Sequence, residues 1–156
     1  MNLTEHFTIQ EVTFSSTADR LGISNVLPAI LWDAVLKTAI GMEKVRTLLG
    51  DKSINVDSWY RCLDLNRALK SKDTSQHLKG EAVDFICPDY GTPTQIAKFI
   101  VQNSDLIKYD QLILEHTWIH ISWNSNPSGG QRGQVLSLLS SGGYTTGLTN
   151  ANGEAV

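Results

Sequence analysis

Three side chains that could ligate one metal ion are split between two separate blocks of the chain. The first block contains His77 and Asp84 with Gly80 between them, and the second contains His120, preceded by Glu115. Two imidazoles and a carboxylate suit a catalytic zinc ion, because three protein ligands leave the fourth position open for water. These residues can share one ion only if the fold brings both blocks together. This requirement constrains the fold more than any other feature of the sequence.

Local backbone geometry allows such a convergence. Asp84 and His120 each fall within a segment that reads as a β-strand. Successive side chains of a strand alternate between its two faces, so neighbouring strands can direct both residues to one side. Gly80 permits a tight reversal of the loop, which can return His77 to a place beside Asp84.

The hydrophobic pattern predicts four helices, at residues 9–14, 28–49, 65–69 and 92–103. In the long helix, Pro28 suits the first position and Gly50 suits the stop. Asp64 is placed to cap the third helix, and Thr92 begins a capping box in the fourth. A core-facing stripe, with residues three and four apart, is expected along the long helix at Leu31, Val35, Thr38, Met42, Val45 and Leu49.

Five strands are expected, at residues 54–59, 82–86, 111–115, 118–123 and 133–139. A two-residue turn separates the third and fourth strands, which predicts a hairpin. A few strands combined with a few helices predict an α+β fold. We expect a single domain over residues 1–144. The tail at residues 145–156 is rich in small polar residues, so we expect it to be irregular and to bury little surface.

Composition limits the partners of this chain. The net charge of −3 and the pI near 5.7 argue against a large phosphate-binding face, so no nucleic-acid partner is expected. No apolar run is long enough to span a membrane. The N-terminus lacks a signal-peptide pattern, so synthesis in a cytoplasm is expected, and the protein is expected to act as a monomer. Cys62 and Cys87 form no C-x-x-C pair and are expected to be reduced thiols.

The two blocks resemble peptidase family M15, zinc D,D-carboxypeptidases and L,D-endopeptidases that cut peptidoglycan peptides. The family pattern has the form S-x-H-x-x-G-x-A-x-D, followed by E-x-x-W-x-H. Every fixed position is met, by Ser75, His77, Gly80, Ala82, Asp84, Glu115, Trp118 and His120. Weaker likenesses at residues 3–7, 58–66 and 132–136 extend the resemblance, which is to the phage-type single-domain members, over residues 3–144. It implies a small antiparallel sheet with helices packed against it, as in the hedgehog and D,D-peptidase folds.

The resemblance also implies roles for the site residues. One zinc ion per chain would be held by His77, Asp84 and His120. Glu115 would be the general base, and Arg61 would bind the substrate and stabilise the oxyanion. By residue type alone, Glu115 could instead be a solvated carboxylate in a turn, and Arg61 a surface cation.

Four other residues near the motif have more than one interpretation. Ser75 could cap its loop or donate to a substrate carboxylate, and Trp118 could belong to the core or to a substrate-binding pocket wall. His116 falls in the predicted turn, so it is left out of the ligand set. Trp59 stands where the family often has glycine, which predicts a narrowed or reshaped pocket.

The sequence therefore predicts a zinc metallopeptidase that hydrolyses one bond of a peptidoglycan stem peptide. A phage endolysin or virion-associated lysin is expected, which would reach the cell wall after release or within a virion. Two alternatives stay open. One is a catalytically inactive zinc-binding module of the same fold, such as a structural virion component. The other is a zinc amidase that acts on the cell wall.

Overall fold

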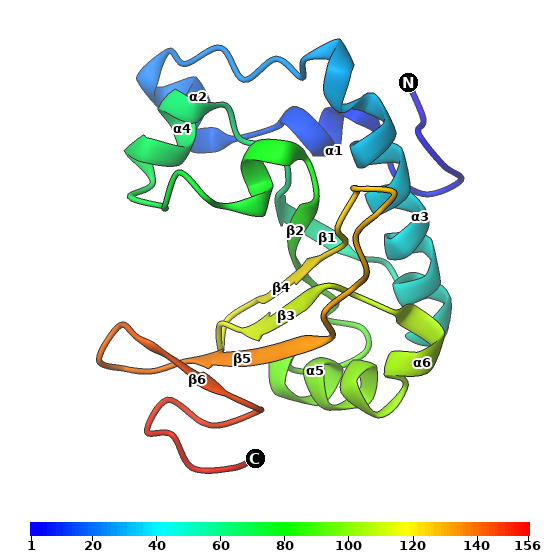
Figure 1. Ribbon diagram of the computed structural model, residues 1–156, viewed down its shortest axis with the longest axis vertical. Helices are drawn as coiled ribbons and strands as arrows, with labels where there is room; N and C mark the ends of the chain where they lie inside the picture. The colour runs from blue at the N-terminus through cyan, green and yellow to red at the C-terminus, as the bar shows by residue number, and fades with distance from the viewer.

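The computed structural model describes residues 1–156 and is built around one six-stranded sheet (Figure 1). The strand order is β1-β2-β4-β3-β5-β6, and every neighbouring pair is antiparallel except β3 and β5, which are parallel. The strands are β1 (Asn55–Ser58), β2 (Ala82–Ile86), β3 (Gln111–Leu114), β4 (Ile119–Ser122), β5 (Gln134–Leu138) and β6 (Tyr144–Thr146). The expected α+β class with a small, mainly antiparallel sheet is confirmed.

Helices pack against this sheet from two ends. α1, α2 and α4 gather at the top of Figure 1, α5 and α6 lie at the bottom, and α3 runs between the two groups. The helices are α1 (Ile9–Thr13), α2 (Ser16–Leu21), η1 (Ala29–Leu31), α3 (Trp32–Leu48), α4 (Leu63–Ala68), η2 (Gln76–Lys79), α5 (Pro93–Gln102) and α6 (Ser104–Ile107). None of them is both long and apolar enough to cross a bilayer.

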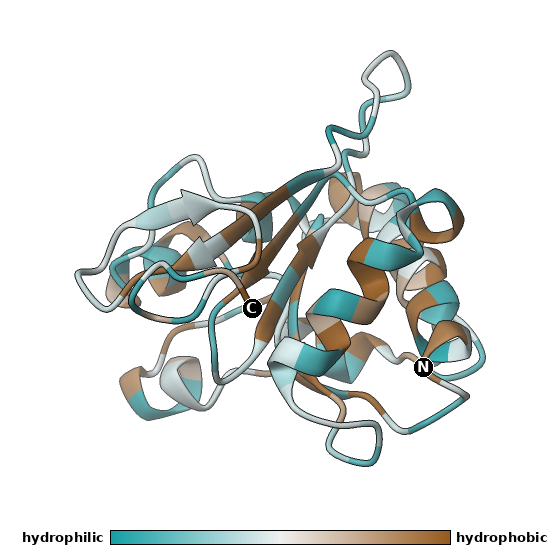
Figure 2. Cartoon of the chain, turned by 90° about the horizontal axis from the view of Figure 1, so that it is seen from below, coloured by the Kyte–Doolittle hydropathy of each residue, from teal (hydrophilic) through white to brown (hydrophobic).

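The central strands separate an apolar face from a polar one. Their buried apolar side chains join α3 and α5 in one core, in which the strand residues are Val83, Phe85, Leu112, Leu114, Ile119 and Ile121. Figure 2 shows this apolar band along the strands beside the helices. Since side chains alternate along a strand, the residues between these positions point to the opposite face. Asp84 and His120 lie at two such positions and therefore share the polar face.

The long helix begins later than its sequence predicts. Pro28 is extended, with ψ of 140°, and the chain then forms the 3-10 turn η1 before α3 begins at Trp32. The predicted stop is confirmed, because Gly50 follows the helix with φ of +74°. Five of the six predicted stripe residues are buried and Leu31 is partly buried. Gly41 is needed for close packing, since a Cβ there would lie 2.4 Å from the ring of Trp123.

Other helix boundaries show where local patterns are insufficient. The capping box at Thr92 is present, as predicted. Asp64 does not cap α4, because the helix begins at Leu63, two residues earlier than predicted, and Cys62 takes the cap position without a side-chain bond. The short helices α2 and α6 are absent from the sequence-based prediction. Each has six residues or fewer, which leaves little periodicity to detect.

The C-terminal segment is bonded to the sheet. The first two residues of the expected irregular tail, Thr145 and Thr146, belong to β6, which pairs with β5 at the outer edge of the sheet, and residues 147–156 contain no helix or strand. The Ser137 hydroxyl donates to the Gly147 carbonyl and accepts from the backbone N–H of Thr149, which is buried. Small polar residues therefore hold this segment through hydrogen bonds, which a pattern of apolar side chains does not predict.

Candidate metal centre

Three potential ligands meet on the polar face of the sheet. Asp84 of β2 lies directly opposite His120 of β4 in the strand register. One carboxylate oxygen of Asp84, Oδ1, is 3.0 Å from Nδ1 of His120 and 3.2 Å from Nε2 of His77. All three residues are buried, and one ligand atom from each lies within 4.8 Å of the others. The structure thus brings together the three residues that the sequence predicts as metal ligands.

The loop around His77 is held from both ends. Ser75 caps η2 by accepting from the backbone N–H of His77, which supports the capping interpretation of this serine. Gly80 ends η2 in the left-handed conformation, with φ of +69°. A Cβ at Gly80 would also lie 2.5 Å from Val35 of α3, so glycine is required both for the turn and for the close approach. The predicted reversal between His77 and Asp84 is present.

The imidazole of His77 is oriented by the backbone. Its Nδ1–H donates to the Trp59 carbonyl over 2.6 Å, which leaves Nε2 directed toward Asp84. Metal-ligating histidines commonly donate their second ring nitrogen in this way, because the bond fixes the tautomer. Burial lowers the pKa of His77, so the neutral imidazole that binds metals is favoured.

Asp84 is poised as an anion. Burial works in the opposite direction, but the adjacent imidazoles of His77 and His120 hold the pKa of this carboxyl well below its usual range. Its second oxygen, Oδ2, accepts a 2.7 Å hydrogen bond from the guanidinium of Arg61. Two buried histidines and one buried carboxylate that converge on one point fit a catalytic zinc ion, with His77, Asp84 and His120 as its candidate ligands.

Arg61 makes a contact that the sequence does not predict. Besides Asp84, its guanidinium donates to the hydroxyl of Ser58 over 2.9 Å. The side chain is 12% exposed, so it is not an ordinary surface cation. It also lines the cleft described below, where it can face a substrate. Arg61 therefore holds a candidate ligand and also lines the cleft.

Glu115 follows β3 at the beginning of the hairpin turn. It is half-buried, and its backbone N–H donates to the Trp118 carbonyl, which closes the turn. Burial and then the negative charge of Asp84 raise the pKa of Glu115. A carboxylate with a raised pKa beside a metal centre suits a general base, because its basicity lies closer to neutral pH.

His116 lies outside the cluster, as the sequence predicts. Its backbone has φ of +66° in the turn, and its Nε2–H donates to the Leu138 carbonyl of β5 over 2.6 Å. This hydrogen bond ties the hairpin turn to the neighbouring strand. His116 therefore has a structural partner of its own and is not among the candidate ligands.

A cleft of about 910 Å³ contains the cluster. Glu115, Arg61, Ser75 and Trp118 also line it. Trp118 is only partly buried, which supports its interpretation as a wall of this cleft. The four predicted catalytic and substrate-binding residues and the three candidate ligands thus share one cavity.

Trp59 does not reshape the cleft, contrary to the expectation from its sequence position. Its side chain is fully buried, contacts Phe7 edge to face, and donates its indole N–H to the Gly80 carbonyl. The large ring therefore points into the core behind the metal cluster. Its contribution to the site is indirect, because its carbonyl and its indole hold the two ends of the loop that carries His77.

Several residues near the site are given no role by the sequence analysis. The hydroxyl of Tyr144 on β6 lies 3.4 Å from Oε1 of Glu115. Gln76 beside the cluster accepts from Ser122 and donates to Asp110, which Arg132 binds through two nitrogens. The pairing of β5 beside β3 brings Tyr144 and Arg132 to the cleft, and no local motif predicts this long-range pairing.

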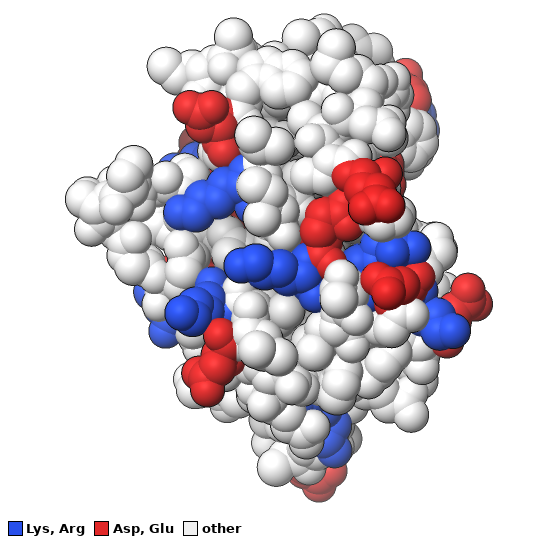
Figure 3. All heavy atoms as spheres, turned by 90° about the vertical axis from the view of Figure 1, so that its right-hand side faces the viewer, with Lys and Arg blue, Asp and Glu red and all other residues white.

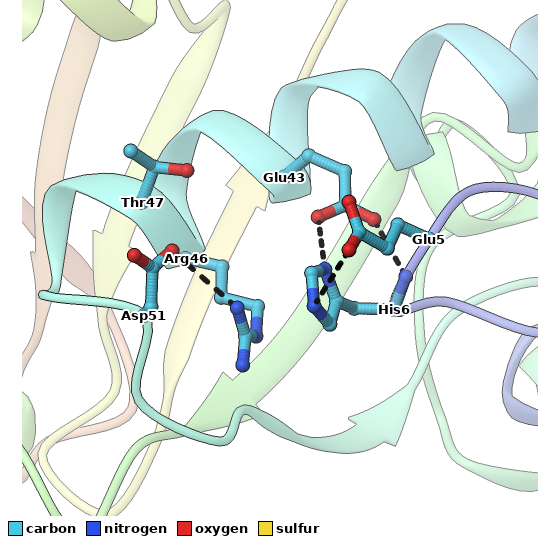
Figure 4. Close-up of a pocket in the computed structure, with 6 residues that line it drawn as sticks. All are labelled: Glu5, His6, Glu43, Arg46, Thr47 and Asp51. Carbon is cyan, nitrogen blue, oxygen red and sulfur yellow. Dashed lines mark hydrogen bonds and ion pairs between the residues drawn. The ribbon is translucent and has the colours of Figure 1, made fainter.

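A second hollow lies between the N-terminal segment and α3 and contains no apolar side chain (Figure 4). His6 binds Glu43 there through both its backbone N–H and its Nδ1, over 2.8 and 2.9 Å. These bonds fasten the N-terminal segment to α3 and give His6 a structural role.

The face in Figure 3 carries Lys and Arg side chains interspersed with Asp and Glu side chains, so neither sign of charge dominates it.

Comparison with known proteins identifies one family. A family model described as Peptidase M15 matches residues 5–122 of the chain, which include all three candidate ligands, Glu115 and Arg61. β5 and β6 lie outside the matched residues. No curated protein sequence matches the chain significantly.

Proposed function

The chain belongs to peptidase family M15, and from this premise we propose that it is a zinc-dependent peptidase that hydrolyses one peptide bond of peptidoglycan stem peptides. The observation that carries the proposal is the buried cluster of His77, Asp84 and His120 in one cleft with Glu115 and Arg61. When bound, zinc supplies a Lewis acid that polarises the scissile carbonyl and makes water more acidic.

The chain's own residues supply the remaining chemistry. Glu115, whose pKa is raised by burial, accepts the proton of the attacking water and delivers it to the leaving amine. Arg61 offers guanidinium N–H donors to the charge that develops on the carbonyl oxygen. Trp118 forms part of the wall that positions the peptide, and Ser75 lines the same cleft.

We also propose that the protein acts as a lysin of phage origin, free or within a virion, as one zinc-loaded monomer. The support is the sequence resemblance to phage-type, single-domain members of the family. The choice between carboxypeptidase and endopeptidase depends on whether the cleft accepts a peptide that continues beyond the cleaved bond. Purified stem peptides with and without such a continuation distinguish the two activities.

The decisive experiment is the digestion of purified peptidoglycan by the zinc-loaded protein, with mass spectrometry of the products. We expect cleavage of one stem-peptide bond. Glu115→Gln should keep its zinc but lose about 100- to 10,000-fold in rate, because it cannot accept a proton at neutral pH. Glu5→Gln, at an exposed carboxylate, is the matched control and should cleave normally.

Each alternative function gives a different result in this experiment. Release of whole stem peptides from the sugar chain would indicate an amidase. Zinc binding without any cleavage by the wild-type protein would indicate a binding module. A Glu115→Gln protein as fast as wild type would show that another group handles the proton.

A further inference from the structure

Part of the lining of the cleft, here called the second arm, comes from the loop that follows α4 and from Arg132 before β5. The loop residues of this arm are Leu69, Lys70, Ser71, Lys72 and Thr74. It contains two lysines, Lys70 and Lys72, and neither forms an ion pair within the structure. The arm therefore presents two cations without a counter-charge.

The acidic residues that line the cavity are Asp84 and Glu115, and neither belongs to the second arm. Asp73 lies in the same loop as the lysines, but it does not line the cleft and is paired with Arg67. Asp84 is already bound by Arg61. Asp110, the partner of Arg132, is buried and does not line the cavity. The second arm is thus basic, although the whole chain has a net charge of −3. A local excess of one sign in a cleft attracts ligands of the opposite sign.

The loop that carries the lysines is held in place before any ligand arrives. Asn66, a fully buried residue of α4, donates from its side chain to the Lys72 carbonyl over 2.9 Å. The Asn66 carbonyl accepts the backbone N–H of Ser71. The Lys72 carbonyl also accepts from Ser75, next to the candidate ligand His77. These bonds therefore hold the backbone of the loop that carries the two lysines beside the candidate metal cluster.

The backbone of Lys70 adds a second observation. It has φ of +57°, in the left-handed region where a helix end strongly favours glycine. A side chain at this position is strained relative to glycine, and residues held in such conformations cluster at binding sites. Lys70 thus places a positive charge at the cleft in a backbone conformation that glycine would adopt with less strain.

We propose that Lys70 and Lys72 bind a free carboxylate of the substrate peptide at a distance from the scissile bond, so that the protein selects anionic stem peptides. This inference rests on the proposed function for the identity of the ligand. Two ammonium groups on flexible side chains recognise charge more than shape. They should therefore distinguish a carboxylate from the carboxamide of the same size.

Two synthetic stem peptides test the inference. They differ only in the carboxylates away from the cleaved bond, which are free in one peptide and amidated in the other. Binding is measured by calorimetry on zinc-loaded Glu115→Gln protein, where cleavage is suppressed, and cleavage on otherwise wild-type protein. We expect the free-carboxylate peptide to bind about 3- to 30-fold more tightly, with a preference that shrinks as salt increases.

The double variant Lys70→Gln/Lys72→Gln should lose this preference, whereas Lys98→Gln on α5, outside the cleft, should keep it. Lys70→Gly/Lys72→Gln relieves the backbone at residue 70, so it separates lost charge from lost folding. If both double variants still prefer the free-carboxylate peptide, the inference is wrong. It is also wrong if the protein with both lysines intact binds the two peptides equally well or binds neither of them.

The two proposals fail in different ways. If the free-carboxylate peptide binds preferentially but is never cleaved, the proposed function fails and the carboxylate site remains. If both peptides are cleaved and bound equally well, the carboxylate site fails and the peptidase remains.

Discussion

The hydroxyl of Tyr144 lies 3.4 Å from the carboxylate of Glu115, across a separation of 29 residues. Tyr144 is on β6, which pairs with β5, and β5 lies parallel to the β3 strand that leads into Glu115. The end of the chain therefore reaches the residue proposed as the general base. The tyrosine hydrogen bond favours the ionised form of Glu115 and so opposes the rise that burial causes in its pKa.

Tyr144→Phe removes this hydrogen bond and leaves the ring. The pKa of Glu115 should then rise further, so the acidic limb of the kcat/KM profile should move to higher pH. The loss of one such bond corresponds to about a 2- to 10-fold lower kcat/KM. Zinc content should not change. Tyr90→Phe, at a ring that stacks on Phe99 away from the cleft, is the matched control. An unmoved acidic limb would show that the contact has no effect on the base.

Metal binding should depend on His120 and not on His116, although both lie in or beside the hairpin. His120→Ala removes one of the three candidate ligands and should abolish most of the zinc, as measured by elemental analysis of the purified protein. His116→Ala removes only the bond to the Leu138 carbonyl, so zinc should remain near one ion per chain. The reverse pattern would contradict the ligand assignment.

Arg61→Lys should separate positioning from catalysis. Lysine can still pair with Asp84 but lacks the planar fork that binds Asp84 and is proposed to bind the substrate at the same time. We expect zinc content near that of wild type and a loss of about 100- to 1000-fold in turnover, the range for removal of one oxyanion donor. Arg67→Lys, at an exposed pair with Asp73, is the control. Near-normal turnover would limit Arg61 to a structural role.

Deleting residues 146–156 tests the C-terminal segment. The sequence predicts little change, because these residues carry few large apolar side chains. The structure predicts the opposite, because the deletion exposes Ser137 and removes the bonds of Gly147 and Thr149 to β5. A loss of about 2 kcal/mol would lower the melting temperature by about 4–8 °C. A melting temperature and activity equal to those of the full chain would show that the segment does not stabilise the domain.

The ionisation of Asp110 should make the free energy of unfolding depend on pH under acidic conditions. Burial raises the pKa of this carboxyl, but the hydrogen bonds from Arg132 outweigh it, so the folded pKa is lowered. The ionised Asp110 carboxylate therefore contributes its full share to the free energy of unfolding above the pKa of an unfolded aspartate, about 4. This share is lost as pH falls from there through the pKa of the folded state. Asp110→Asn should be less stable at pH 7 by about 1–3 kcal/mol. Denaturant titrations should show this difference shrinking below about pH 4, and a constant difference would contradict it.

Much of this protein follows from the sequence by itself. β2 was predicted with its observed bounds, the capping box of α5 is present, and most of the stripe on α3 is buried. The reversal between His77 and Asp84 also follows from the sequence, because it depends on one glycine, whereas the joining of His120 to them was predicted from the resemblance to the family and required β2 and β4 to pair. The local features depend on residues a few positions apart, so a single segment contains the information.

The tertiary structure decided what depends on distant partners. It paired Arg61 with Asp84, directed Trp59 into the core and brought Tyr144 to Glu115. The sequence leaves the position of Trp59 open, because a large aromatic side chain can line a cleft or fill a core. Only the packing of the whole core places this ring inside. β6 forms because backbone groups of one segment meet those of another. Pairing between strands far apart in the chain depends on how the whole core closes, which no local pattern specifies.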